Sequence, residues 1–277
     1  MTCTTGNHIT HIYFVLDRSG SMGSIADDVI GGFNAFLANQ KAEGDDALMT
    51  FVQFDSQNAQ EYLCVNTAIG TVRELNAQTY IPRGGTPLYD AMGFTLSLAL
   101  QREVELKAAG QHAENVVFIT FTDGHENASS EYTRERIFNL VNLKQEEGWT
   151  FVFMGANQDA YAAGDSVGVG MANASNWVAD SAGTSLAFND LSVATRNRRV
   201  KTKAGQVFDS RDLFEGGKSA DADAARRHYR ESLELAVAQL KQMTGGRRRG
   251  IEVRKPLTKT VTASARRMYP FSVWATR

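Results

Sequence analysis

Five oxygen-bearing side chains fall in three short motifs whose composition suits a divalent cation. They are Asp17, Ser19 and Ser21 in DRSGSM, Thr86 in GGTP, and Asp123 in FTDG. Hard cations such as Mg²⁺ prefer oxygen ligands, and Mg²⁺ usually keeps several waters and accepts one or two protein carboxylates. Two acids and three hydroxyls meet that preference without any histidine or cysteine. We therefore expect Mg²⁺ as the cofactor, with Mn²⁺ and Ca²⁺ as alternatives.

The elements that must position these residues are read from the hydrophobic pattern. Four short apolar runs predict strands, and three of them lack polar alternation, as strands covered on both faces of a parallel sheet do. The runs lie at residues 12–16, 51–54, 116–121 and 151–154, with helical spacing over 25–37, 88–104 and 132–141. The stretch AQEYLCV, which follows the second run, predicts its antiparallel hairpin partner. Strands that alternate with helices indicate a layered α/β fold with right-handed crossovers.

The three motifs are expected to meet at one edge of this sheet. Asp17 follows the apolar run HIYFVL and Asp123 follows VVFITF, so both acids come where a strand ends. In open α/β sheets, ligands bind in the crevice outside the carboxyl ends of the strands. Gly20 lets the neighbouring serines turn toward one point, and the two glycines before Thr86 let its loop approach closely.

Together, Asp17-x-Ser19-x-Ser21, Thr86 in GGTPLYDA and Asp123 in FTDG resemble the metal-ion-dependent adhesion site of von Willebrand factor type A (VWA) domains. The resemblance implies a doubly wound, mostly parallel central sheet flanked by helices, Rossmann-like in layout. It also implies that the hydroxyls approach the metal directly and that the two acids often act through water. A protein partner would then fill the open coordination position with an Asp or Glu carboxylate.

Three further residues are candidates for the surroundings of the site. Asp90 lies one helical turn after Thr86, where it either orients the Thr86 loop or a bound water, or is a surface acid in the first turn of a helix. His125 and Glu126 follow Asp123, and they either rim the metal and contact a partner or belong to an exposed loop. Asp55, at the end of the second apolar run, is interpreted as a turn residue.

Charge divides the chain into an acidic front and a basic back. Residues 1–195 hold 9 Lys and Arg against 23 Asp and Glu (net −14), and residues 196–277 hold 20 against 8 (net +12). We expect a VWA domain over residues 8–195, a basic linker over 196–219, and a C-terminal helix with a basic tail over 220–277. The basic segments favour a solvated tail, or docking on the acidic surface of this chain or a neighbouring copy; nucleic acid is the less favoured partner.

Several function classes find no support in the sequence. We find no G-x-S-x-G nucleophile elbow, no GxxxxGK[ST] phosphate loop and no paired histidine spacing for zinc, so we expect no enzyme. Cys3 and Cys64 make no disulfide framework, no apolar run reaches the roughly 18 residues of a membrane span, and the N-terminus lacks a secretory signal. A cytoplasmic protein without a membrane partner is therefore expected.

Three functions remain in competition. The leading interpretation is a stand-alone intracellular module that binds a protein partner through Mg²⁺. The second is an assembly subunit whose VWA-type domain and basic tail build a larger complex. The third is a metal-assisted hydrolase, since an open cation position can activate water, but no general base is evident in the sequence.

Overall fold

The structure, a computed structural model, describes residues 9–243, over which strands and helices alternate. The strands are β1 (Thr10–Asp17), β2 (Ala47–Asp55), β3 (Asn58–Ala68), β4 (Asn115–Thr122), β5 (Thr150–Ala156) and β6 (Ala174–Trp177). The helices are α1 (Ala26–Ala42), α2 (Leu88–Ala108), α3 (Arg134–Glu146), α4 (Ala160–Ser166), α5 (Ser181–Lys203) and α6 (Ser219–Met243), with 3-10 turns η1 (Gly20–Ile25), η2 (Ile69–Thr71) and η3 (Met171–Asn173). The chain divides into two compact units, Met1–Glu231 and Ser232–Arg277, and the sheet belongs to the first.

One six-stranded sheet runs in the order β3-β2-β1-β4-β5-β6. Neighbouring strands pair in parallel except for β3, which is antiparallel to β2. This is the strand order of doubly wound Rossmann-like sheets, whose ligand crevice lies where the order reverses, here between β1 and β4. The expected fold class and the hairpin partner of the second apolar run are therefore confirmed.

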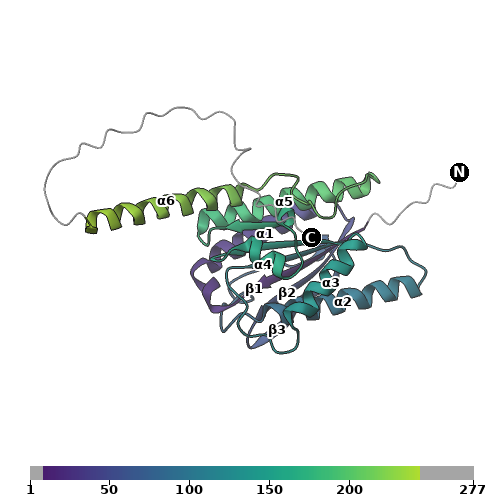
Figure 1. Cartoon of the computed structure of the whole chain (residues 1–277). Coiled ribbons are helices and arrows are strands. Elements are labelled where there is room, and N and C mark those ends of the chain that lie inside the picture. Colours follow the sequence, from purple (N-terminus) through teal and green to yellow (C-terminus); the bar gives the residue numbers. More distant parts are fainter. Residues whose placement is uncertain (1–8, 244–277) are drawn as a thin grey trace, which may run out of the picture. The chain divides into compact units, whose positions relative to one another are not determined.

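Alternation along β1 builds two hydrophobic layers. Ile12, Phe14 and Leu16 belong to the cluster that contains the apolar residues of α1 and α5. Tyr13 and Val15 belong to the cluster on the other face, with residues of α2, α3 and α4. Successive side chains of a strand point to opposite faces, so a strand buried throughout serves both layers. Figure 1 shows α1 and α5 on one side of the sheet and α2 and α3 on the other.

The contact between α1 and α5 depends on a glycine. A Cβ atom on Gly32 of α1 would lie 2.3 Å from Cδ2 of Phe188 on α5, closer than packed atoms approach. The Phe188 ring also stacks on Phe121 of β4, with the ring centroids 4.6 Å apart. Through this ring α5 packs on α1 and on the sheet at once.

The expected domain boundary and linker differ from the structure. Residue 195 lies inside α5, which continues to Lys203, so the segment 196–219 does not begin as a connection. Leu213 and Phe214, also within that segment, are buried members of the hydrophobic core. The sequence did not indicate that α5 continues past residue 195, because the polar, basic stretch looks exposed. In the structure, α5 buries arginines as well as apolar side chains.

Arg199 of α5 is fully buried and closes the end of α1. Its guanidinium donates to the main-chain oxygen of Gln40 and, at 2.8 Å, to that of Gly44. It also pairs with Asp46 at 2.6 Å, and Lys203 reaches the same carboxylate at 2.9 Å. A guanidinium suits this position because its several donors can satisfy carbonyls and a carboxylate together.

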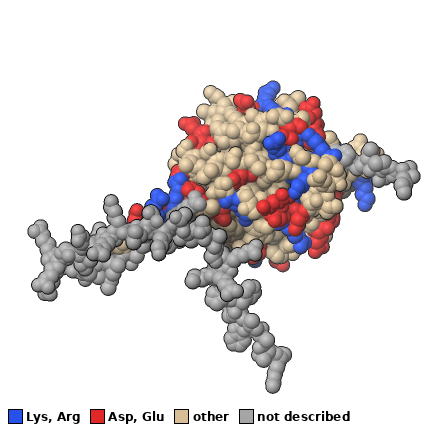
Figure 2. All heavy atoms as spheres, turned by 90° about the horizontal axis from the view of Figure 1, so that it is seen from above, with Lys and Arg blue, Asp and Glu red and all other residues tan. Residues whose placement is uncertain are grey.

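Other cations of the basic run also face acids of the same unit. Arg196 pairs with Glu43, and Lys201 pairs with Glu215. In the face seen in Figure 2, Lys and Arg side chains lie next to Asp and Glu side chains. The RNRRVKTK run thus docks partly on the acidic front of its own chain, one of the alternatives left open by the sequence.

The helix expected after residue 220 is present as α6. The basic tail that follows Met243 lies outside the described residues. Among the helices of residues 9–243, none has the length and apolar character that crossing a membrane requires.

Replacing Arg199 by methionine is expected to lower the free energy of unfolding by about 3 kcal/mol, because two main-chain oxygens and Asp46 lose their donor. Urea unfolding followed by circular dichroism measures the change. Arg196→Met is the matched control: that side chain is 60% exposed, and its loss should cost less than about 1 kcal/mol. Equal losses of stability in the two variants would contradict the inference that the buried contacts of Arg199 with Gln40, Gly44 and Asp46 stabilise the fold.

Candidate metal site

The residues of the three sequence motifs gather at the carboxyl edge of the sheet, beside the crevice between β1 and β4. They are Asp17 at the end of β1, Ser19 and Ser21 in the turn into α1, Thr86 before α2, and Asp123 after β4. The hydroxyl of Ser21 donates to Oδ1 of Asp123 at 2.7 Å, and the Ser19 and Ser21 hydroxyls are 3.1 Å apart. The sequence prediction that these groups meet at one edge is therefore confirmed for the serines and the two strand ends.

Thr86, in the loop before α2, approaches the same edge. Its main-chain N–H donates to Oδ1 of Asn127 at 2.8 Å, and the Asn127 N–H donates back to the Thr86 oxygen at 3.1 Å. A Cβ atom on Gly124 would lie 3.5 Å from Oγ1 of Thr86 and 3.7 Å from Oγ of Ser21. The glycine therefore leaves open a small space that both hydroxyls border.

Asp17 is buried without exposed surface, and neutral donors hold both of its carboxylate oxygens. Oδ1 accepts from the Ser19 N–H at 2.7 Å, and Oδ2 accepts from the Thr122 hydroxyl at 2.6 Å. The main-chain oxygen of Asp17 accepts from the hydroxyl of Tyr80, also at 2.6 Å. The carboxylate is thereby fixed in orientation while its negative charge stays uncompensated.

The electrostatics of the two acids favour a cation. Within residues 9–243 no Lys or Arg forms an ion pair with Asp17 or Asp123, and the adjacent Arg18 pairs elsewhere. Burial raises the pKa of Asp17 from 3.8 to about 6, and the charge of Asp123 adds to that rise against opposing hydrogen bonds. Burial likewise raises the pKa of Asp123. A bound cation would relieve both carboxylates at once.

The donor set fits Mg²⁺ in kind. Two carboxylates and three hydroxyls are hard oxygen donors. Among residues 9–243, no Lys or Arg side chain pairs with either of the two acids. In the described part of the chain, no group of three or more His, Cys, Asp or Glu side chains comes together as a metal cluster. A site on this edge therefore depends on the serine and threonine hydroxyls as much as on the acids.

Arg18, between the first two motif residues, forms a buried ion pair that the sequence analysis missed. Its Nε and Nη2 donate to Oδ2 of Asp55 at 2.9 and 2.6 Å, and Arg83 reaches the same oxygen at 3.0 Å. The N–H groups of Gln57 and Asn58 donate to Oδ1 at 2.7 and 3.1 Å. Asp55 is therefore more than the turn residue expected, because it ties together three segments of the edge.

The loop before Thr86 approaches its neighbours as closely as its glycines allow. Gly84 has φ +67°, and a Cβ there would lie 2.4 Å from Oγ of Ser56. The Gly84 oxygen accepts from the Gly20 N–H at 3.0 Å, and Oγ of Ser56 accepts from the Gly85 N–H at 2.9 Å. The expected close approach of this loop is confirmed, and a side chain at Gly84 would be both strained and obstructed.

Asp90 and Glu126 organise the loop after β4. Asp90 is 4% exposed, and its carboxylate accepts from the N–H groups of residues 130–132 at 2.7–2.9 Å, so its reading as a surface acid is wrong. Glu126 accepts from the N–H of Tyr89 in the first turn of α2 at 3.0 Å. His125 is exposed, as the loop interpretation expects. The metal-rim role of His125 and Glu126 remains a prediction.

Some of the missed residues carried a usable signal. Asp55 ends a buried strand, which is the same signal that identified Asp17, and Arg18 is a charged neighbour of that motif. Thr122 ends β4 beside Asp123 at the same edge. Asn127 bonds to Thr86 across loops far apart in sequence, and no local pattern indicates such a contact.

Comparisons with known proteins bear on the fold. No family model and no curated protein matches the chain. Among solved structures, the pilus adhesin SpaC from Lactobacillus rhamnosus GG aligns with a TM-score of 0.50 at 14% identity, covering 69% of this chain and 31% of SpaC. The SpRpn10 VWA domain aligns with a TM-score of 0.47 at 8% identity, covering 66% of this chain and 95% of that domain. Manganese-loaded Plasmodium vivax TRAP aligns with a TM-score of 0.44 at 16% identity, covering 65% of this chain and 72% of TRAP. The likeness to SpaC, at this identity, is one of fold alone, and the chain spans less than a third of SpaC.

Replacing Asp17 by asparagine is expected to stabilise the metal-free protein at pH 7.5 by about 2 kcal/mol. The folded carboxyl has a raised pKa, so its favourable contribution is present below pH 3.8 and is lost as pH rises through about 6. Asparagine removes the buried charge and keeps an acceptor for the Ser19 N–H. Urea unfolding in chelator from pH 4 to 8 measures the difference between variant and wild type.

The difference should shrink toward pH 4, where the wild-type carboxyl becomes protonated. Asp27→Asn, an exposed acid in the first turn of α1, is the control and should change stability by less than about 1 kcal/mol. A destabilised Asp17→Asn protein at pH 7.5 would refute the inference that Asp17 holds an uncompensated charge.

Proposed function

We propose that the chain is a protein-interaction module that binds Mg²⁺ at the candidate site and, through it, a carboxylate of a protein partner. One observation carries the proposal: Asp17 and Asp123 are buried with no Lys or Arg partner among the described residues, at the strand edge where the hydroxyls of Ser19, Ser21 and Thr86 gather. Neutral donors alone leave their charge uncompensated in a medium of low dielectric. The VWA-like fold, which the comparisons support, is compatible with this role.

The chain's own residues divide the work of such a site. Ser19, Ser21 and Thr86 would hold the cation directly through their hydroxyl oxygens. Both oxygens of Asp17 already accept hydrogen bonds, so we expect Asp17 to act through water, and Asp123 to orient the Ser21 hydroxyl. A bound cation supplies the attraction that lets an acidic edge accept a partner's carboxylate.

The other interpretations have less to support them. Assembly through the basic tail concerns residues beyond Met243, outside the described part. The argument for nucleic-acid binding loses support because Arg196, Arg199 and Lys201 form ion pairs with acids of the same chain. Our proposal includes a cytoplasmic location and no catalysis; the free thiol of Cys64 suits a reducing compartment.

Mg²⁺ is expected to bind and to raise the melting temperature of the wild-type protein, because binding to the folded state alone stabilises it. Ser21→Ala should remove this shift, whereas Ser24→Ala should keep it. Both serines lie on η1 and are exposed, so the pair matches in position and chemistry. Isothermal titration calorimetry with MgCl₂ checks the binding directly. Unchanged Mg²⁺ binding by Ser21→Ala would contradict the assignment of Ser21 as a ligand of the cation.

The interaction itself is tested by capture from native lysate with wild-type, Ser21→Ala and Ser24→Ala baits in Mg²⁺. We expect a protein retained by wild type and Ser24→Ala to be lost with Ser21→Ala and with chelator. Quantitative mass spectrometry identifies it and measures the loss, which should exceed about tenfold if a charge-assisted contact is removed. Identical retained sets in Mg²⁺ and chelator would refute a metal-dependent interaction.

A further inference from the structure

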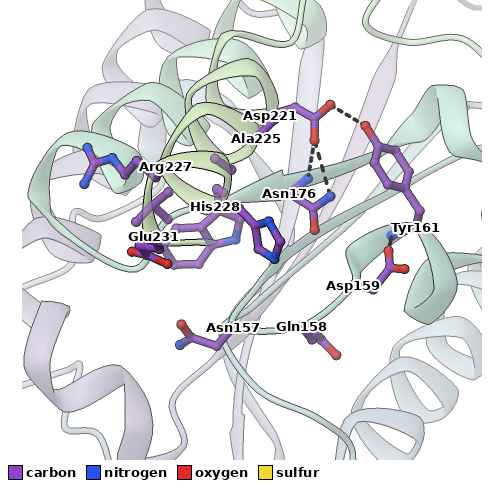
Figure 3. A pocket seen from close by; sticks show the side chains of 13 residues that line it. Asn157, Gln158, Asp159, Tyr161, Asn176, Asp221, Ala225, Arg227, His228 and Glu231 are labelled. Atoms are coloured by element: carbon purple, nitrogen blue, oxygen red, sulfur yellow. Dashed lines mark hydrogen bonds between the residues drawn. The ribbon is translucent and has the colours of Figure 1, made fainter. Parts of the chain in front are cut away.

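A second pocket opens at the same edge of the sheet, over the ends of β5 and β6. Its volume is about 710 Å³, within the range of ligand-binding pockets. Figure 3 shows residues of the β5–α4 loop across from residues of α6, with Asn176 between them. The lining residues that matter here are Asn157, Asp159, Tyr161, Trp177, His228 and Glu231.

The lining is acidic and aromatic. The lining includes three carboxylates, those of Asp159, Asp221 and Glu231, and one arginine, Arg227, which gives a net charge of −2 when histidine is counted as neutral. Tyr161, Trp177 and His228 supply ring surface in the same pocket. Acids together with aromatic rings suit a cation, which gains both Coulomb and cation–π attraction.

The one arginine of the lining is already engaged. Arg227 pairs with Asp180 and, at 3.0 Å, with Asp223. In Figure 3 its guanidinium points away from the other labelled side chains. An anionic ligand would therefore meet carboxylates rather than a free guanidinium, which argues against a phosphate group.

Asp221 is also engaged, and Oδ1 of Asp159 caps α4, so Oδ2 of Asp159 and the carboxylate of Glu231 remain for a ligand. Tyr161 donates its hydroxyl to Asp221, and the Asn176 N–H donates at 3.2 Å. Lys218, outside the lining, attracts Asp221, while its ammonium donates to the main-chain oxygens of Met171 and Ala174. Within the described residues, no Lys or Arg forms an ion pair with either of the other two acids.

Trp177 adds a donor that lacks an acceptor. Its side chain lines the pocket and is 2% exposed, and its indole N–H has no hydrogen-bond partner in the described part of the chain. Its ring is held in place by stacking on Phe121, with centroids 4.6 Å apart. A buried N–H without a partner is costly, so a ligand with a carbonyl oxygen would relieve it once an adjacent side chain rotates aside.

The pocket is joined to the candidate metal site by one hydrogen bond. Gln158, which lines the pocket, donates from Nε2 to the main-chain oxygen of Gly124 at 2.9 Å. Gly124 follows Asp123 directly and borders the space shared by the Ser21 and Thr86 hydroxyls. A polypeptide bound at one site is therefore within reach of the other.

We infer that this pocket takes a lysine or arginine side chain of a protein partner. The cationic head lies between Asp159 and Glu231 and against the aromatic rings, and a main-chain carbonyl of the partner accepts from the Trp177 N–H. The claim that the same partner also donates a carboxylate to the metal site rests on the proposed function. The pocket itself does not depend on it.

The probe is N-acetyl-arginine methylamide, titrated into the full chain and followed by the Trp177 indole N–H signal in ¹H–¹⁵N NMR, assigned with Trp177→Phe. Saturable binding in the millimolar range is expected, with a shift of that signal as the N–H gains an acceptor. N-acetyl-citrulline methylamide has nearly the same shape without the charge and should bind at least about fivefold more weakly.

The double variant Asp159→Asn/Glu231→Gln should weaken arginine binding at least about fivefold, and Glu234→Gln should not. Asparagine can still cap α4 at residue 159, and Glu234 is an exposed acid of α6 outside the lining. Equal binding of the two probes, or no saturable shift, overturns the inference. Mg²⁺ and chelator should give the same result, so failure of the metal proposal leaves this titration unaffected.

The link between the two sites has its own test. The protein captured in a Mg²⁺-dependent way should also be lost with the double variant and retained by Glu234→Gln. Full retention by the double variant would overturn the shared partner, even where the arginine probe binds as expected.

Discussion

The buried carboxylate of Asp55 is the interaction on which the whole edge depends. It has no exposed surface, yet two arginines and two main-chain N–H groups meet on it from three segments. Burial alone would raise its pKa, but the Gln57 N–H and Arg18 outweigh that effect and hold the pKa below its usual value. Removing one member of such a group strands the others without partners, so the segments must fold together.

This arrangement explains how Asp17 can stay uncompensated one strand away. Arg18 follows Asp17 in the chain and would neutralise it if it turned inward. Instead, Nη2 of Arg18 pairs with Asp55 at the end of β2 and, at 2.5 Å, with Oε2 of Glu61 on β3. The neighbouring acids at strand ends therefore receive different environments: one is paired with arginines, and the other is left with hydroxyls and N–H groups alone.

The sequence predicted the parts of the molecule that obey local periodicity. Apolar runs located the strands, helical spacing located α1 and α2, and the rule for carboxyl ends brought Asp17 and Asp123 to one crevice. The failures share a physical cause: they concern polar groups that become buried through contacts distant in sequence. For Asp90 the sequence left a helix-surface acid as one of two interpretations, and neither included the three N–H groups of a later loop that cover its carboxylate. Arg199 was likewise expected in a linker, because its partners Gly44 and Asp46 are distant in sequence.

The close contact of Gly32 with Phe188 has a consequence for how the chain folds during its synthesis. The ribosome synthesises β1 and α1 early, but the ring of Phe188 that packs on them follows about 150 residues later. At a synthesis rate of roughly 5–20 residues per second, that layer waits on the order of ten to thirty seconds for its cover. Phe14 of β1, which is fully buried in the finished protein and stacks on Phe188 with ring centroids 6.3 Å apart, lacks that ring in this interval, although Phe33 and Phe36 of α1 are already present. We therefore expect this part of the core to stay incomplete until α5 has left the ribosome.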